Sequence, residues 1–264
     1  MATFFLKVNI FFEILATHVL DSKPYHTPMD TTLNLSRSMG EVLPSSKEYH
    51  QVVGAPQYLT LTRPDIAFVV NKLAQFLHCA TDIHWQACKR LLRYLQDTSN
   101  SGLWLRPSVA LSIQCYSDSD WAGCPDDRRS TSGYLVYFGG NLISWSSKKQ
   151  PTVARSSTES EYKALANATA ELMWLRTLLR EIGYLPLQPA TLWCDNMSAI
   201  YLTSNPVFHA LTKHVEIDYY FIRDQIRHGT VQIQFTKSSD QIADILTKPL
   251  GHILFSSHLH EASL

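Results

Sequence analysis

The stretch that most constrains the fold of this chain runs from Ile113 to Trp121 and reads I-Q-C-Y-S-D-S-D-W. Its period of two predicts a β-strand, because successive side chains of a strand point to opposite faces of a sheet. The strand ends on two carboxylates, Asp118 and Asp120, although aspartate is disfavoured within strands. Asp-Ser-Asp also suits a turn, so this pair alone does not identify a functional site.

Three further acids occupy comparable positions downstream. Glu161 stands at the start of a predicted helix, Asp195 at the end of a predicted strand and Asp244 in a late helix. Together with Asp118, these acids are too far apart in the sequence to meet through local structure, so only the fold can gather them. Four carboxylates at one edge of a sheet would form a site for Mg²⁺, which prefers hard oxygen ligands.

Each acid also has an ordinary structural explanation. The aspartates that follow strands suit turns. Residues Thr158 to Glu161 read T-E-S-E, which matches a capping box with Thr158 as the cap. Asp244 could pair with Lys248, one helical turn later. Taken singly these explanations are favoured, whereas the four acids together favour a metal site.

The composition describes a globular protein with a hydrophobic core. The chain has 264 residues, of which 45% are hydrophobic and 17% charged, and this excludes a mainly disordered chain. The formal net charge is zero, so contact with nucleic acid would depend on local basic patches. The cysteines are odd in number and lack paired spacing, which predicts reduced thiols in an intracellular protein, with cytoplasm and nucleus equally open; they are Cys79, Cys88, Cys115, Cys124 and Cys194.

The first hundred or so residues predict helices rather than strands. We expect residues 1–20 to form a short amphipathic helix, rather than a signal peptide or a membrane span, and residues 21–43 to form a loop. Helices are expected from Ser46, from Pro64 and over about 83–96. Pro56 falls inside the first helix and should break or kink it, at a cost of ~3 kcal/mol.

From Gly102 the apolar period changes to two. Strands are expected over 102–105, 111–117, 132–138, 142–146, 190–194 and 230–235, with a hairpin turn about Gly139-Gly140-Asn141. Helices are expected over 158–182, 196–203, 215–228 and 239–247. This order predicts an α/β domain with a mixed sheet flanked by helices.

Five motifs resemble, in order and spacing, the ribonuclease H domain of copia-type retrotransposon Pol polyproteins. They are Y-S-D-S-D-W-A-G-C-P-D-D-R-R-S-T-S-G-Y, S-W-S-S-K-K-Q, S-S-T-E-S-E-Y, W-C-D-N and A-D-I-L-T-K-P-L. Upstream, the motifs T-P-M, T-R-P-D-I-A and L-L-R-Y-L resemble the segment that joins reverse transcriptase to that domain. The resemblance covers most of the chain after the first twenty residues.

The resemblance implies a ribonuclease H-like mixed five-stranded sheet flanked by helices and preceded by a small, mainly helical segment. It divides the chain into a reverse transcriptase thumb or connection-like remnant (1–107), a ribonuclease H-like domain (108–250) and a C-terminal tail (251–264). Because every strand expected from Leu111 onward lies in the second part, we also expect residues 108–250 to fold without the upstream segment.

The resemblance implies an endonuclease that hydrolyses the RNA strand of RNA–DNA hybrids with two Mg²⁺ or Mn²⁺ ions. The family's catalytic and metal-binding acids correspond to Asp118, Glu161, Asp195 and Asp244, with Asp120 in reserve. In the implied arrangement Asp118 bridges both ions, Glu161 and Asp195 hold mainly one, and Asp244 holds the other. Glu161 would also sense the ribose 2′-hydroxyl, which distinguishes RNA from DNA.

Several polar residues next to these elements are candidates for holding the substrate. They are Arg128, Arg129, Lys148, Lys149, Arg155 and Asn196, together with His214 in a T-K-H motif that resembles the family's. Basic runs are usually solvated surface, and only their position beside the predicted site favours a role in binding the hybrid.

The chain lacks the polymerase palm with its paired aspartates, so the resemblance does not imply DNA synthesis by this chain alone. The implied partners are an RNA–DNA hybrid and the polymerase portion of a reverse transcriptase. No association with a membrane is expected. Pro56 and Tyr220 depart from the leucine and histidine that are common in the family, which indicates a truncated copy. The alternative function is a non-catalytic relic, a structural or nucleic-acid-binding module that keeps the fold.

Overall fold

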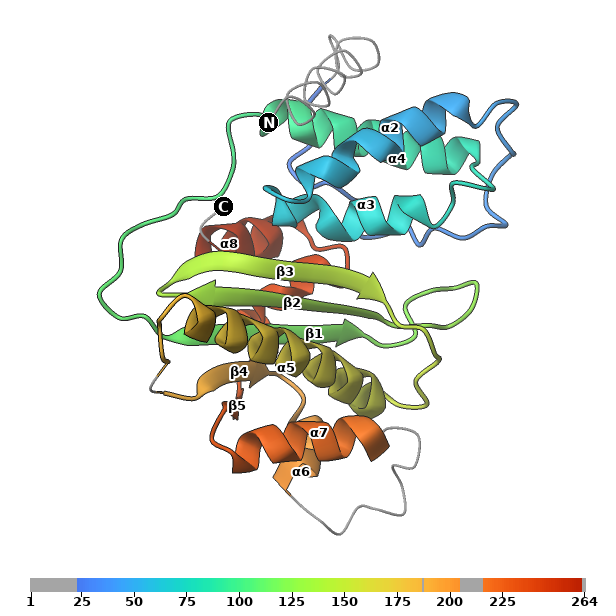
Figure 1. Cartoon of the computed structure of the whole chain (residues 1–264). Helices are drawn as coiled ribbons and strands as arrows, with labels where there is room; N and C mark the ends of the chain where they lie inside the picture. The colour runs from blue at the N-terminus through green and yellow to red at the C-terminus, as the bar shows by residue number, and fades with distance from the viewer. Residues whose placement is uncertain (1–22, 187, 205–215, 263–264) are drawn as a thin grey trace.

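The computed structural model describes residues 23–186, 188–204 and 216–262. Within this range a mainly helical segment packs against a five-stranded sheet that carries helices on both faces (Figure 1). The expectations for residues 1–20 and for His214 concern parts of the chain outside the described residues. No helix in the described ranges is long and apolar enough to cross a membrane.

The helical segment contains α2 (Lys47–Leu59), a 3₁₀ turn η1 (Pro64–Ile66), α3 (Ala67–Ala74) and α4 (Asp82–Asp97). Helix α4 is capped by Thr81, whose hydroxyl accepts the backbone N–H of His84, while Nδ1 of His84 accepts the backbone N–H of Thr81 at 3.0 Å. This reciprocal capping satisfies amide groups that have no partner within the helix. The buried residues of α4 follow the helical period and face the rest of the segment.

The prediction that Pro56 breaks the first helix is wrong. Helix α2 continues through Pro56 to Leu59, and Pro56 belongs to its buried face together with Tyr49, Val52 and Val53. Pro56 lies near the end of the helix, and its carbonyl still accepts the N–H of Thr60 at 3.1 Å. Burial of this face compensates for the hydrogen bond that proline cannot donate.

The sheet contains β1 (Ile113–Asp120), β2 (Thr131–Phe138), β3 (Asn141–Lys149), β4 (Ala190–Cys194) and β5 (Val231–Phe235), in the order β3-β2-β1-β4-β5. Strands β1 to β3 are antiparallel neighbours, while β4 is parallel to both β1 and β5. The hairpin turn has positive φ at Gly139 (59°) and Gly140 (78°), where glycine carries little strain. This mixed five-stranded sheet flanked by helices confirms the predicted fold class.

The strand expected over residues 102–105 is wrong. These residues form no strand, and they lie in the long connection from α4 to β1, where Trp104 and Leu105 are exposed. A short alternating run has no strand structure unless another strand pairs with it, and the sequence alone does not show whether a partner exists.

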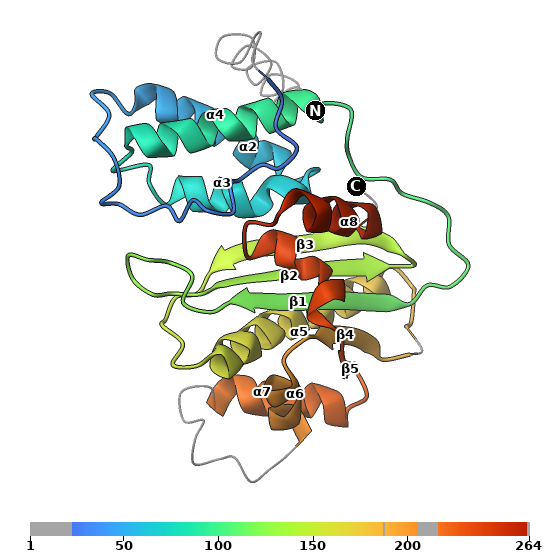
Figure 2. The ribbon, with the colours of Figure 1, turned by 180° about the vertical axis from the view of Figure 1, so that it is seen from behind.

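Helices cover both faces of the sheet. Helices α5 (Ser157–Glu181), α6 (Met197–Ser204) and α7 (Glu216–Arg227) lie on one face, and α5 crosses it (Figure 1). The opposite side carries the 3₁₀ turn η5 (Ile242–Leu246) and α8 (His252–Glu261), as Figure 2 shows. A further 3₁₀ turn, η4 (Ser238–Asp240), precedes η5, so the single helix expected over 239–247 is replaced by two short turns.

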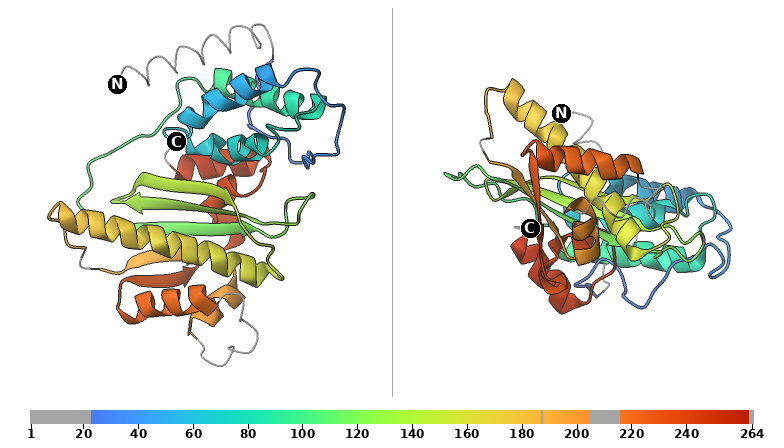
Figure 3. Two further views of the ribbon diagram at one scale, coloured as in Figure 1. Left: turned by 45° about the vertical axis from the view of Figure 1, so that its right-hand side comes forward. Right: turned by 90° about the horizontal axis from the view of Figure 1, so that it is seen from below.

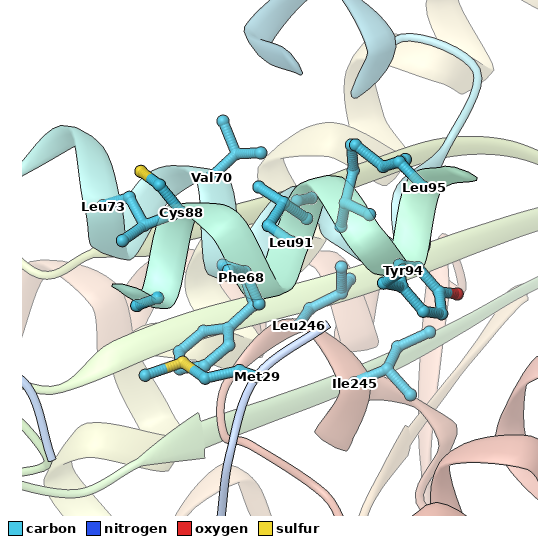
Figure 4. Close-up of a cluster of buried hydrophobic side chains, with 14 of the residues drawn as sticks. Met29, Phe68, Val70, Leu73, Cys88, Leu91, Tyr94, Leu95, Ile245 and Leu246 are labelled. Atoms are coloured by element: carbon cyan, nitrogen blue, oxygen red, sulfur yellow. The ribbon is translucent and has the colours of Figure 1, made fainter. Parts of the chain in front are cut away.

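Two hydrophobic cores follow from this arrangement. The first lies between the sheet and α5, α6 and α7. The second joins the helical segment to the other face of the sheet, and the two lie side by side in Figure 3. Phe68, Leu91 and Tyr94 share it with Leu246, as Figure 4 shows, and with Leu135 of β2. Residues 108–250 are expected to fold without the upstream segment, but that segment supplies part of the second core. Independent folding of this fragment stays a prediction.

A polar contact reinforces the second core. The indole N–H of Trp145 on β3 donates to the carbonyl of Thr60 after α2, at 2.8 Å. The T-R-P-D motif also has a structural explanation, because Arg63 forms a buried ion pair with Asp65 at 2.7 Å and Tyr94 donates to the same carboxylate at 2.6 Å. The motif therefore links α4 to η1 and positions the helical segment.

The residues expected to form a C-terminal tail include helix α8, whose Phe255 is buried in the second core. The three-part division of the chain at 107 and 250 stays a prediction. All five cysteines lie in the described ranges, and none of them forms a disulfide there.

Candidate active site

The candidate site is centred on the end of β1. This strand continues to Asp120, so Asp118 and Asp120 point to the same face, and Asp118 is almost completely buried (2% exposed). On the neighbouring strand Gly133 lies opposite Asp118. A Cβ atom at Gly133 would lie 2.6 Å from Leu246 Cβ and 3.0 Å from Thr247 Cγ2, so only glycine permits η5 to approach the sheet this closely.

The approach of η5 brings Asp244, Thr247 and Lys248 to Asp118. The Thr247 hydroxyl donates a hydrogen bond to Asp118 Oδ2. The Lys248 ammonium lies 3.0 Å from Asp244 Oδ1 and 3.7 Å from Asp118 Oδ2. The predicted pairing of Asp244 with Lys248 is therefore present, but Asp244 is buried (4% exposed), and the lysine neutralises part of the charge of two carboxylates.

Glu161 reaches the site from the first turns of α5. The capping explanation for this residue is wrong, because the cap of α5 is Ser156, whose hydroxyl accepts the N–H of Glu159 at 3.1 Å. Glu161 is instead 5% exposed, and its Oε1 accepts the backbone N–H of Ser119 in β1 at 3.1 Å. Its Oε2 is buried and has no hydrogen-bond partner among the described residues.

Asp195 follows β4, the strand parallel to β1, and is half-buried. Its Oδ2 accepts a hydrogen bond from the Ser238 hydroxyl at 2.7 Å. Cys194 Sγ and carboxylate oxygens of Asp195 and Glu161 all lie within 4.8 Å of one another. The four predicted acids therefore lie in two adjoining groups, one with Asp118 and Asp244 and one with Glu161 and Asp195.

The proximity of these groups is expressed in their pKa values. Burial, followed by the charges of Asp118 and Asp195, raises the pKa of Glu161 well above its usual value. Burial and then Asp118 raise the pKa of Asp244 to about 8, although Lys248 lowers it. Burial tends to lower the pKa of Lys248, but Asp118 and Asp244 outweigh it and the pKa is raised. The carboxylates therefore repel one another, and the Lys248 ammonium offsets only part of their charge.

Asp120 lies at the edge of this cluster. Burial is the main cause of its raised pKa. Asp118 adds to the increase, and Lys248 opposes it. The next residue, Trp121, is half-exposed, and its indole N–H donates to the carbonyl of Ala154 at 3.1 Å. Asp120 remains the reserve ligand of the sequence prediction.

A buried polar network that the sequence analysis missed supports the strand and helix that carry Asp118 and Glu161. Gln150 Nε2 donates to Ser132 Oγ at 2.8 Å and to the carbonyl of Ser160 at 3.0 Å, and the Ser119 and Ser160 hydroxyls are hydrogen-bonded to each other. The run S-W-S-S-K-K-Q carries Gln150, but nothing in its local pattern shows that its amide is buried. Thr247, Ser238 and Cys194 were missed for the same reason.

The structure separates the predicted substrate-binding residues into two groups. Arg128, Arg129, Lys148 and Arg155 are exposed, although the Arg129 guanidinium lies 3.7 Å from Asp127 Oδ2. Lys149 is occupied, because its ammonium lies 2.9 Å from Asp127 Oδ2 and donates to Cys124 Sγ at 3.0 Å. Asn196 caps α6, since its Oδ1 accepts the N–H of Ala199 at 3.0 Å. The exposed residues are the better candidates for contact with a phosphate backbone.

Comparison with known proteins gives relatives over most of the chain, while no protein-family model matches it. The chain is 48% identical over 241 residues, 91% of its length, to the retrovirus-related Pol polyprotein from transposon RE2 of Arabidopsis thaliana. It is 37% identical over 235 residues to the corresponding polyprotein from transposon TNT 1-94 of Nicotiana tabacum. The chain spans only 17% and 18% of these relatives.

A shorter relative carries a different name. The chain is 51% identical over 133 residues to secreted RxLR effector protein 161 of Plasmopara viticola, and the match covers 50% of this chain and 94% of that protein. The transposon polyprotein matches a much larger share of this chain, 91% against 50%.

Solved structures with similar folds are distant in sequence. The N-terminal RNase H domain of rv2228c from Mycobacterium tuberculosis is 11% identical, with a TM-score of 0.39, and the match covers 58% of this chain and 99% of that one. The foamy viral protease-reverse transcriptase dRH in complex with double-stranded DNA is 11% identical, with a TM-score of 0.47, over 86% of this chain and 35% of that one.

Proposed function

Since the chain belongs to the retrovirus-related Pol polyproteins of copia-type transposons, we propose that it is the ribonuclease H part of such a polyprotein and hydrolyses the RNA strand of RNA–DNA hybrids. The observation that carries this proposal is the convergence of four carboxylates from four separate segments on the end of β1. Capping and turn formation do not require this convergence, whereas a site for divalent cations does.

The residues of the cluster fit Mg²⁺ or Mn²⁺. Their donor atoms are carboxylate oxygens, which these ions prefer, and the mutual repulsion of the acids is the kind that a bound cation relieves. Glu161 Oε2 is buried without a hydrogen-bond partner among the described residues, so one ligand atom is free to bind an ion. Asp118, Glu161, Asp195 and Asp244 would hold the ions.

When bound, such ions activate an attacking water and stabilise the departing 3′ oxygen of the RNA strand. The chain itself contributes rigid positioning. The Thr247 hydroxyl fixes Asp118 and the Ser119 amide fixes one oxygen of Glu161, while the exposed Ser238 hydroxyl donates to one oxygen of the half-buried Asp195. Fixed ligands lower the entropy cost of assembling a reactive geometry. We also assign to Glu161 the recognition of the ribose 2′-hydroxyl.

Exposed basic residues around the site would hold the phosphate backbone. The chain has no net charge, so we expect the affinity for hybrid to rest on few contacts and to depend only weakly on salt. Replacing Arg128 and Arg129 by alanine should weaken binding and lower the slope of log affinity against log salt. An unchanged slope would mean that this loop is ordinary surface.

The test of the proposed function is cleavage of a hybrid with a labelled RNA strand by the full chain in Mg²⁺, Mn²⁺ or EDTA. We expect cleavage with either ion, none in EDTA, and a loss of orders of magnitude in Asp118→Asn. Asp224→Asn is the matched control, because Asp224 is an exposed acid on α7 that pairs with Arg227, and it should retain full activity. Binding of hybrid without cleavage in either ion would contradict the proposal and support the non-catalytic module.

The chain corresponds to a small part of its relatives, so we propose that it works beside the polymerase portion of a reverse transcriptase. The upstream helical segment of this chain stays with the sheet in such an assembly, because removing it would expose the second core. Co-purification with a polymerase portion from the same type of polyprotein tests this partner, and failure to associate would count against it.

A further inference from the structure

A thiol lies within the acid cluster. Cys194 is the last residue of β4 and is completely buried, and its Sγ atom lies within 4.8 Å of carboxylate oxygens of both Glu161 and Asp195. In the same group Glu161 Oε2 is buried with no hydrogen-bond partner in the described ranges. Two carboxylates and one sulfur therefore converge; Glu161 has one uncommitted oxygen, while Cys194 Sγ accepts only the backbone N–H of Asn196 at 3.4 Å among the described residues.

Sulfur changes the class of cation that this group can hold. Mg²⁺ prefers oxygen, whereas Zn²⁺ and Cd²⁺ accept thiolate and carboxylate together. A tetrahedral site with zinc bond lengths places neighbouring ligand atoms roughly 3.5 Å apart. The present spacing therefore requires only a small adjustment, which Asp195 can make because it is half-buried and its hydrogen-bond partner Ser238 is exposed.

We propose that Glu161, Asp195 and Cys194 form a site for a soft divalent cation such as Zn²⁺ or Cd²⁺, with the fourth position open to solvent or substrate. On binding, the Cys194 thiol releases its proton to solvent and Sγ forms a bond to the cation. The site rests on the proposed function in that it shares two carboxylates with the assigned Mg²⁺ ligands. A soft cation would therefore exclude Mg²⁺ from this half of the cluster and inhibit cleavage.

Only one half of the acid cluster contains sulfur, so a soft cation is expected to bind there and not at the other half. Asp118 and Asp244 are accompanied by the Thr247 hydroxyl and the Lys248 ammonium. Neither group supplies sulfur, so this half of the cluster has no preference for a soft cation over Mg²⁺. The selectivity for soft cations thus depends on a single atom, Cys194 Sγ, and this makes the proposal testable by substitution.

The test is a titration of the full chain with Cd²⁺ in buffer without Mg²⁺, followed by the thiolate-to-cadmium charge-transfer absorption and by calorimetry. Wild type should show the band with one equivalent of Cd²⁺. Cys194→Ser should lose the band and bind Cd²⁺ about tenfold more weakly or worse, with little change in Mg²⁺ affinity. Cys115→Ser is the matched control, because Cys115 is equally buried on the adjacent strand β1, and it should retain the band.

Two outcomes would overturn the proposal: an undiminished band in Cys194→Ser, or loss of the band in Cys115→Ser with the fold intact by circular dichroism. If Cys194→Ser does not fold, Glu161→Gln replaces it, since this variant keeps the sulfur but should weaken Cd²⁺ binding; unchanged Cd²⁺ affinity would refute the site. Hybrid cleavage in Mg²⁺ without a Cys194-dependent band would refute this inference alone. A Cys194-dependent band without cleavage would refute the proposed function and leave the cation site standing.

Discussion

Replacing Glu161 by glutamine separates a metal ligand from a purely structural residue. A carboxylate of Glu161 whose oxygen lies up to 4.8 Å from that of Asp195 experiences a repulsion of about 3 kcal/mol at an effective dielectric constant of ~20. The protein can avoid this repulsion by keeping Glu161 protonated, and at pH 7 this costs about 3 kcal/mol for a carboxyl group with an ordinary pKa. Either way the metal-free protein is destabilised by its own site.

Glutamine removes that destabilisation while keeping the shape of the side chain. Its amide oxygen can accept the Ser119 N–H, and its amide nitrogen can donate toward the neighbouring carboxylates. We expect Glu161→Gln to raise the unfolding free energy in EDTA at pH 7 by about 1–3 kcal/mol, since part of the repulsion is already relieved by relaxation. For a chain of this size each kcal/mol corresponds to roughly 2–4 °C in melting temperature.

The same substitution should abolish the response to Mg²⁺. Saturating Mg²⁺ stabilises a binding protein by about 2.7 kcal/mol at one hundred times its dissociation constant, and Glu161→Gln should lose most of this gain together with hybrid cleavage. Glu159→Gln is the control, because Glu159 lies in the same helical turn but pairs with Lys163 at 2.8 Å. It should lose only about 0.5 kcal/mol and keep the Mg²⁺ response. A Glu161→Gln variant that is no more stable than wild type in EDTA, or is equally stabilised by Mg²⁺, would refute the reasoning.

Three further predictions follow from the packing and charge of the site. Gly133→Ala should cost about 1–3 kcal/mol and reduce cleavage, because its methyl group displaces η5, while Gly102→Ala, in open space, should change denaturant stability little; equal effects would contradict this. Without metal, the free energy of unfolding should fall as pH rises from 5 to 8, because the Asp244 carboxyl has a pKa of about 8 in the folded chain against 3.8 in the unfolded chain and so holds its proton more tightly when folded. Mg²⁺ should reduce this loss of stability. A stability that does not change with pH would contradict the prediction. Residues 108–250 alone should melt several degrees below the full chain, because the second core is opened, and equal melting temperatures would show that this core is dispensable.

Much of the fold follows from local sequence patterns. The period of two in β1, β2 and β4, the glycines between β2 and β3, and the long helical period of α5 each express a local preference for one backbone conformation. The four acids were also identifiable, because a resemblance in motif order places them at corresponding positions. The local preferences of the strands and of α5 persist in the folded chain because each element buries its apolar face.

Other features depend on groups that meet only in the folded chain. Ser156 and Thr158 are both suitable caps for α5, and the sequence does not distinguish them. In the structure Ser156 is the cap, and Glu161 instead receives the amide of Ser119 on a different element. Likewise Pro56 remains in a helix because that face is buried, and residues 102–105 form no strand because no strand pairs with them.

The sequence by itself determined the strand that carries Asp118, the order of the later elements and, through the resemblance in motifs, the identity of the candidate acids. Only the tertiary structure decided what surrounds those acids: the Lys248 ammonium between Asp118 and Asp244, the thiol of Cys194 and the approach of η5 that Gly133 permits. The reason is physical. Backbone preferences act over a few neighbouring residues, whereas charge, coordination and close packing depend on atoms that long stretches of chain separate.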